Sequence, residues 1–190
     1  MLKNIALRFG WVPLALVVCL PVTAQQLTPD QTRCRNKGKP FSLDVQISGC
    51  TAVLQSDVSA GNRAVAYTNR GIAYSGKKDY DRGIADFNEA VRLDPSLAEP
   101  YNNRGCAYQD KGHYDRAIAD YSEAITIDPS RAVIAYRNRG HLFEAQGRRE
   151  EAIADFQQAL AIDPKHKRIR EALKRLGVAP RVIRQGRSTR

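Results

Sequence analysis

Residues 67–71 read YTNRG, and the same pattern returns as YNNRG at 101–105 and as YRNRG at 136–140. The glycines that end these pentapeptides are 34 and 35 residues apart. Self-similarity at a fixed period of this length indicates a repeat architecture, in which each repeat is one supersecondary unit. The pentapeptide therefore sets the frame in which the rest of the chain is interpreted.

The end of each repeat is also alike, with LDP at 93–95 and IDP at 127–129 and 162–164. A residue before proline is disfavoured in the helical region, so each Asp-Pro pair predicts the end of a helix. Small residues in both halves of a repeat let two helices approach closely, which predicts a helical hairpin. Ser96 and Glu99 additionally predict a capping box where the second repeat begins.

Each repeat carries an aromatic, a glycine, an aromatic, a small residue, an aromatic, an alanine and a proline in the same order. These residues are Tyr67, Gly71, Tyr74, Gly83, Phe87, Ala90 and Pro95; Tyr101, Gly105, Tyr108, Ala117, Tyr121, Ala124 and Pro129; and Tyr136, Gly140, Phe143, Ala152, Phe156, Ala159 and Pro164. The pattern resembles the tetratricopeptide repeat. The resemblance implies an all-α fold, an α-solenoid of three helix-turn-helix repeats at 63–96, 97–130 and 131–164.

Both ends of the array have sequences that fit capping units, which stacked repeats need. The apolar residues after the third repeat recur at helical spacing and stop at Gly177, which predicts a capping helix over 165–178. The N-terminal segment, 25–62, is expected to hold a short helix from Ser42 to Gln55. This segment resembles a degenerate half repeat.

The first residues have the features of a secretory signal peptide. Lys3 and Arg8 precede an apolar run at 12–22, and small residues end the segment at Ala24. We expect cleavage after residue 24, with retention as an anchor as the alternative. The run is shorter than the roughly 20 residues of a membrane span. With this segment the chain is similar to small exported bacterial tetratricopeptide repeat proteins, which implies a periplasmic or secreted protein.

Three cysteines lie outside the signal segment. In an oxidising compartment, Cys34 and Cys50 are expected to form a disulfide, which leaves Cys106 alone. A metal site would need closely spaced ligand pairs, and the three histidines, His113, His141 and His166, are scattered. We therefore expect neither a metal nor another cofactor.

Two patterns resemble enzyme sites and are disfavoured. Residues 71–78 nearly match a phosphate-binding loop, but Lys78 stands where Ser or Thr must reach magnesium, and the stretch lies in a predicted helix. Cys106 and His141 occupy equivalent places in successive repeats, which would suit a thiol nucleophile and its base. No third orienting residue is evident, and neighbouring helix axes lie about 8–10 Å apart. The sequence favours a protein without enzymatic activity.

The inner face of the array is the expected binding surface for a peptide or protein. The candidate residues on this face are Thr68, Asn69, Ile72, Asn102, Asn103, Cys106, Arg137, Asn138 and His141. They mix small apolar and polar groups, as a shallow groove for a helix or an extended segment would. The alternative is a structural, self-associating envelope protein, whose groove is filled by its own leader or by a second copy.

Some members of the resembled family grip the C-terminal carboxylates of chaperones with an Asn in the middle repeat and cationic groups on the flanking repeats. Asn103 matches that Asn. The flanking positions hold Thr68, Ile72, Ile134 and Asn138, so the cations are missing. A carboxylate clamp is therefore not expected.

The charge of the chain, formally +10, is concentrated at the C-terminal end. Residues 165–190 carry a net +9, whereas residues 63–164 carry a net −2. The last residues, 179–190, are expected to be a disordered basic tail, and a simple solvated tail is the first interpretation of such a charge run. Contact with anionic envelope surfaces is the alternative. No aromatic residue accompanies these charges, which makes nucleic acid an unlikely partner.

Overall fold

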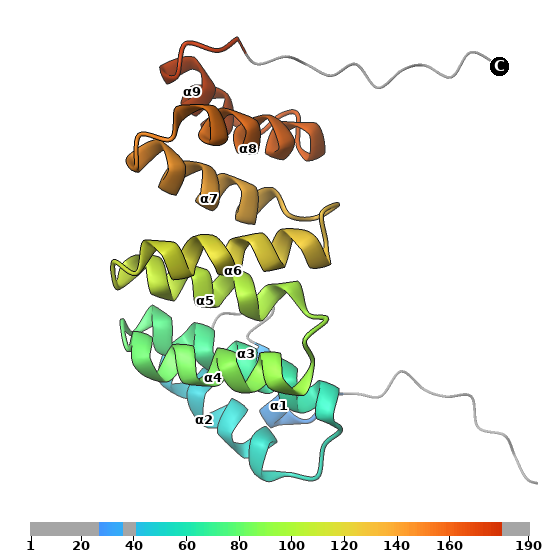
Figure 1. Ribbon diagram of the computed structural model, residues 1–190. Helices are drawn as coiled ribbons and strands as arrows, with labels where there is room; N and C mark the ends of the chain where they lie inside the picture. Colours follow the sequence, from blue (N-terminus) through green and yellow to red (C-terminus); the bar gives the residue numbers. More distant parts are fainter. Residues whose placement is uncertain (1–26, 36–40, 180–190) are drawn as a thin grey trace, which may run out of the picture.

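The computed structural model describes residues 27–35 and 41–179, and all regular structure within these ranges is helical. The helices are α1 (Pro29–Arg35), α2 (Leu43–Gln55), α3 (Ala60–Gly76), α4 (Tyr80–Leu93), α5 (Ala98–Asp110), α6 (Tyr114–Ile127), α7 (Val133–Ala145), α8 (Arg149–Ile162) and α9 (Lys167–Arg175). They stack in chain order from α1 to α9 (Figure 1). The predicted all-α solenoid is confirmed.

The three predicted repeats are the hairpins α3–α4, α5–α6 and α7–α8. Gly112 (φ 78°) and Gly147 (φ 73°) stand in the turns of the second and third hairpins. Lys78 takes the same left-handed conformation (φ 63°) in the first hairpin, although its side chain disfavours it. The stretch that resembles a phosphate-binding loop thus runs through α3 into a hairpin turn, where no strand precedes it.

A glycine of the first helix meets a buried ring of the second helix in every repeat. A Cβ added to Gly71 would lie 2.7 Å from the Phe87 ring, and one added to Gly105 would lie 2.8 Å from the Tyr121 ring. Gly140 meets Phe156 in the same way, and all three rings are fully buried. The glycines are therefore required by close packing. In each repeat the ring stands sixteen residues after its glycine.

A buried ion pair, which the sequence analysis did not predict, lies next to each of these contacts. The arginine before each glycine donates two hydrogen bonds to an aspartate sixteen residues later: Arg70 to Asp86, Arg104 to Asp120 and Arg139 to Asp155, at 2.7–2.9 Å. Such two-point pairs are strong and fix orientation. The bonds to the aspartates raise the pKa of the three arginines, against burial, which lowers it.

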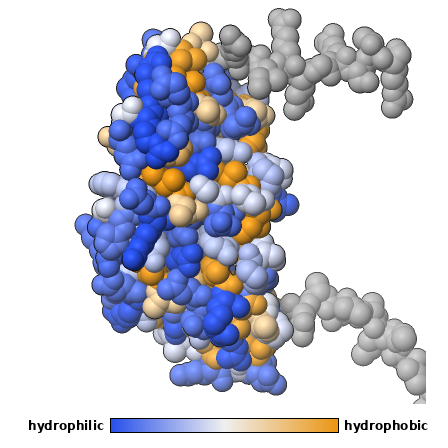
Figure 2. Space-filling model, in the orientation of Figure 1, coloured by the Kyte–Doolittle hydropathy of each residue, from blue (hydrophilic) through white to orange (hydrophobic). Residues whose placement is uncertain are grey.

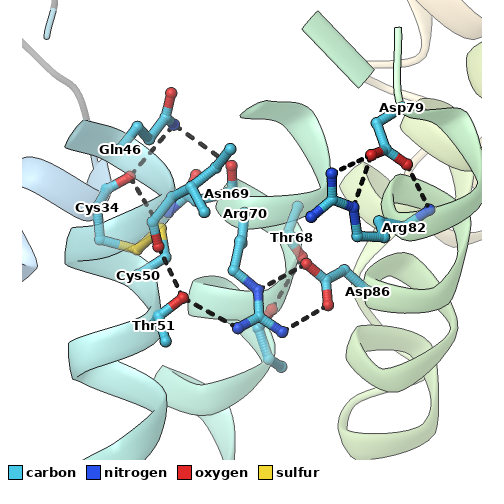
Figure 3. A network of polar contacts seen from close by, with 12 residues as sticks. Cys34, Gln46, Cys50, Thr51, Thr68, Asn69, Arg70, Asp79, Arg82 and Asp86 are labelled. Carbon is cyan, nitrogen blue, oxygen red and sulfur yellow. Dashed lines mark hydrogen bonds and ion pairs between the residues drawn. A yellow bond between two sulfur atoms is a disulfide. The ribbon is translucent and has the colours of Figure 1, made fainter. Parts of the chain in front are cut away.

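The same arginines also link each hairpin to the one before it. The third guanidinium nitrogen of each arginine donates to the preceding hairpin: that of Arg70 to Thr51 Oγ1, that of Arg104 to Asn88 Oδ1 and that of Arg139 to Ser122 Oγ. Figure 3 shows Arg70 between Thr51 and Asp86, close to the disulfide. Each arginine further lies over the tyrosine of its own pentapeptide, 5.4–5.8 Å from the ring centre. One side chain thus ties together three helices.

The N-terminal segment is a complete, degenerate hairpin, which corrects the expected half repeat. The predicted disulfide joins Cys34 of α1 to Cys50 of α2, sixteen residues apart, the same separation as the glycine and the ring of a repeat. Arg33 precedes Cys34 as each repeat arginine precedes its glycine. Gly49 stands in the place of the aspartate, and a Cβ there would lie 2.6 Å from Arg33 Cβ. The disulfide thus replaces the packing of glycine against a ring.

Two further expectations concern helix ends. The C-terminal capping helix is present as α9, whose Ile169, Ala172 and Leu173 are fully buried in the core of the third repeat. The capping box is wrong, because α5 is preceded by Leu97 and has no side-chain cap. Ser96 instead turns back and donates from its hydroxyl to Asp94 Oδ1 at 2.6 Å. Asp94 therefore accepts from the hydroxyl that the capping box would have used.

Other expectations lie partly or wholly outside the described residues. The signal segment, 1–24, is outside them, and so is almost all of the basic tail, whose residues 180–190 are not described. Within 27–35 and 41–179, no helix has both the length and the apolar character that crossing a membrane requires.

The equivalence of the disulfide with the contact between glycine and ring in a repeat can be tested by substituting the two cysteines. Replacing both cysteines by serine (C34S, C50S) should destabilise the N-terminal hairpin by about 3 kcal/mol, the value for a loop of this length. Replacing them by the repeat's own pair (C34G, C50F) should recover part of that loss. Amide hydrogen exchange of α1 and α2 measures both, with α6 as internal control. Equal exchange in the two double variants would reject the equivalence.

The buried ion pairs predict that substitutions of their two residues have non-additive effects on the free energy of unfolding. Asp120→Asn should cost about 3–5 kcal/mol in urea unfolding, because it leaves the Arg104 charge buried without its partner. The double variant R104M, D120L should be closer to the wild type, since apolar residues can replace a buried pair. The control is Glu89→Gln, which breaks the exposed pair with Arg92 and should cost less than about 1 kcal/mol. Additive losses at Arg104 and Asp120 would contradict the pairing.

Candidate binding face

The inner side of the solenoid is formed by the first helices of successive hairpins. Helix α3 contacts α1 and α5, and α5 contacts α7. Direct contact between first helices places them on the inside of the curve that stacked repeats produce. We call this surface, made by α1, α3, α5 and α7, the inner face.

The candidate residues of the first repeat differ in accessibility. Ile72 is half-buried, and Asn69 is half-buried and accepts a hydrogen bond from Gln46 Nε2 at its backbone carbonyl. Thr68 is a correction to the expected site. Its side chain is only 3% exposed, and its hydroxyl donates to the carbonyl of Ala64. Thr68 therefore contributes to packing between helices and presents little surface to a partner.

The middle of the inner face holds a small polar cluster around Cys106. The Tyr121 hydroxyl lies 2.8 Å from Gln109 Oε1 and 3.4 Å from Cys106 Sγ. Asn138 Nδ2 donates to the same sulfur at 3.4 Å, and Asn138 Oδ1 accepts from Arg137. Sequence reasoning selected Cys106, Arg137 and Asn138 but missed the tyrosine hydroxyl, which the flanking repeats, with Phe at this place, do not have.

Cys106 and His141 do not form a nucleophile and its base. The Cys106 sulfur accepts hydrogen bonds from Tyr121 and Asn138. His141 Nδ1 instead lies 3.3 Å from Glu144 Oε2, and the imidazole packs edge-on against the Phe156 ring. Burial raises the pKa of the Cys106 thiol, the reverse of what nucleophilic activation requires. Both residues serve packing and polar contacts of the inner face.

Two hollows open at the end of the inner face where the first helices begin. One has a volume of 510 Å³ and lies beside Ile134, which is 52% exposed; we call it the Ile134 hollow. The other, 490 Å³, lies beside Val65, which is 38% exposed; we call it the Val65 hollow. Exposed aliphatic side chains beside concave surfaces are typical of binding sites.

The remaining asparagine candidates lie on α5. Asn102 lines the Ile134 hollow, and its Oδ1 is buried without a hydrogen-bond partner. Asn103 is half-buried. A buried acceptor without a partner costs free energy that a donor from a ligand would recover. Asn102 is therefore the candidate most suited to contact a bound segment.

A second surface of distinct chemistry is the outer face of α9. Lys167, Arg168 and Lys174 are exposed there, and Glu171 is the one acidic residue of this helix. Arg175 instead turns back to the array and pairs with Glu144 at 3.0 Å. On the side shown in Figure 2, hydrophilic residues dominate and hydrophobic ones form separate patches. Within the described ranges, no three His, Cys, Asp or Glu side chains group as metal ligands would.

The match to a known family follows the hairpins described above. The tetratricopeptide repeat model matches residues 64–97, 98–131 and 133–166. The chain belongs to the tetratricopeptide repeat family. No curated protein matches the sequence.

Solved structures of other tetratricopeptide proteins have a similar fold. The Arabidopsis OM64 TPR domain is 30% identical, with a TM-score of 0.59 over 62% of this chain and 97% of that chain. MamA is 26% identical, with a TM-score of 0.58 over 66% and 71%. The second TPR domain of human RPAP3, in complex with the HSP70 peptide SGPTIEEVD, is 26% identical, with a TM-score of 0.58 over 63% and 98%.

The raised pKa of Cys106 predicts slow thiol chemistry. Because the thiol stays protonated at neutral pH, the rate of its alkylation by iodoacetamide should rise with pH. The pH at the midpoint of that rise should be higher than for an unperturbed cysteine. Mass spectrometry over a pH series measures this, with the unfolded protein in urea as the reference. A midpoint at or below that of the unfolded protein would revive the nucleophile hypothesis.

Proposed function

We propose that this tetratricopeptide array is a non-enzymatic scaffold that holds a peptide or protein segment on its inner face in the cell envelope. The observation that carries the proposal is the Ile134 hollow, where an exposed aliphatic side chain lies beside the unpartnered Asn102 Oδ1. An apolar surface with a few placed polar groups is what peptide recognition needs.

The expected ligand differs from an acidic chaperone tail. The similar RPAP3 domain is in complex with the acidic HSP70 peptide SGPTIEEVD. In this chain Thr68 is buried, and Ile72, Ile134 and Asn138 occupy the other places where a carboxylate clamp would have its cations. Without cations at these positions, burying a carboxylate there would cost more than it returns. We infer that the partner contacts the inner face through apolar and backbone groups.

An envelope location is supported by the N-terminal sequence and by the disulfide. The apolar run at 12–22 and the small residues before residue 25 have the pattern of an export signal. A buried disulfide that replaces a core contact of the repeat suits a protein that folds in an oxidising compartment. The exposed cations of α9, together with the arginines after residue 180, would favour contact with anionic envelope surfaces.

Photo-crosslinking in cells tests the proposal. A photoreactive residue at Asn102 or at Arg137 on the inner face should give a recurrent adduct with a foreign protein in the envelope fraction, identified by mass spectrometry. The same residue at Glu123, exposed on α6, is the control and should not give that adduct. Adducts only with further copies of the chain would favour the self-associating structural protein.

A further inference from the structure

The Val65 and Ile134 hollows are the same structural position, two repeats apart. Val65 and Ile134 each stand six residues before the glycine of their own repeat, and Ala66 and Ala135 each stand five before it. The volumes, 490 and 510 Å³, are nearly equal. The repeat geometry has therefore built a hollow twice at the same position. Apolar groups dominate the lining of the Ile134 hollow, whereas polar groups dominate that of the Val65 hollow, where Val65 itself is exposed.

The polar groups at the two hollows correspond as well. Gln31 lines the Val65 hollow three residues before Cys34, and Asn102 lines the Ile134 hollow three residues before Gly105, so each hollow has one side-chain amide at the same place. This correspondence includes the degenerate hairpin, because Cys34 takes the place of the repeat glycine.

The charges at the two hollows differ. Asp57 and Arg35 line the Val65 hollow, so its charges balance. Asp128 and Arg131 line the Ile134 hollow and lie 3.6 Å apart, and Glu99 lines it as well, which leaves one carboxylate in excess. Aliphatic side chains are the groups that gain most from such sites.

The equivalent position on α5 is different, and it lines the Ile134 hollow. Glu99, on α5, stands six residues before Gly105, where α3 and α7 have Val65 and Ile134. The next residue, Pro100, is fully buried, whereas Glu99 is exposed and has no ion-pair partner among the described residues. Along the stack, the inner face thus presents an aliphatic, an acidic and an aliphatic residue in order.

A polypeptide fits this arrangement better than a lipid chain. The buried Asn102 Oδ1 lacks a donor, and a backbone N–H of an extended segment would supply one. Arg137, a cation of the same face, is on the next turn of α7 and lines neither hollow. The unbalanced charge is therefore the carboxylate of Glu99, on the α5 side of the Ile134 hollow.

We propose that the inner face binds an extended segment in which two aliphatic side chains flank a basic one. The aliphatic side chains fill the Val65 and Ile134 hollows, and the basic side chain pairs with Glu99. This inference rests on the proposed function and names the chemistry of the partner.

The test uses the full chain and labelled peptides with two leucines, Gly/Ser spacers of graded length, and Lys, Gln or Glu at graded positions between the leucines. By fluorescence anisotropy, the wild type should bind one spacer length best and prefer Lys over Glu about tenfold. Glu99→Lys should reverse that preference. Val65→Glu and Ile134→Glu should each weaken binding at least about tenfold, since each replaces the aliphatic contact of a hollow by a charge without a partner.

Two matched variants serve as controls. Val45→Glu changes a valine that is 37% exposed on α2, outside both hollows, and Glu123→Lys makes the same charge change on α6. Both should bind as the wild type does, and circular dichroism should show that all variants fold.

Several results would overturn the inference. These are an affinity that does not depend on the residue between the leucines, an unchanged preference for Lys over Glu in Glu99→Lys, or the absence of binding to every peptide. A foreign protein still crosslinked from Asn102 in Val65→Glu and Ile134→Glu would keep the proposed function and reject this chemistry. Self-association that Ile134→Glu abolishes, seen by light scattering, would identify a second copy as the occupant and also reject it.

Discussion

A buried arginine that pairs with an aspartate sixteen residues later is the interaction on which the array depends. It holds the two helices of a hairpin together, reaches the hairpin before it and stacks on the tyrosine of its own pentapeptide. The following glycine lets the second-helix ring come close. Pairs that bond at two points fix both distance and angle. The pentapeptide thus sets the geometry of each repeat and its junction with the previous one.

This fixed geometry is what gives the inner face a function. Because each junction is held in the same way, hollows at equivalent positions have nearly the same size, and the distance between them is set by stacking rather than by loops. A partner with two suitably spaced anchors meets a preorganised surface and loses less free energy to ordering. The degenerate hairpin extends the surface by one unit, with a disulfide in the place of a glycine and a ring.

The sequence predicted the features that repeat and missed those that depend on neighbours. Gly105 and Tyr121 recur with the period, so their packing could be inferred. Helix α1 was missed because cysteines stand at the two places that define the motif, which hides the repeat. Thr68 lies on the inner side of α3 by helical period, yet α3 packs between α1 and α5, and its side chain is buried. The hollows require three helices at once, which no single segment reveals.

The most direct test of the account is a methyl NMR titration of the protein with the partner recovered by crosslinking. The methyl resonances of Val65 and Ile134 should shift together along one binding curve, because both hollows hold the same segment. Those of Val45, on the outer helix α2, should stay in place. A partner that shifts Val45 and leaves Val65 and Ile134 unchanged would show that binding occurs elsewhere and contradict the account.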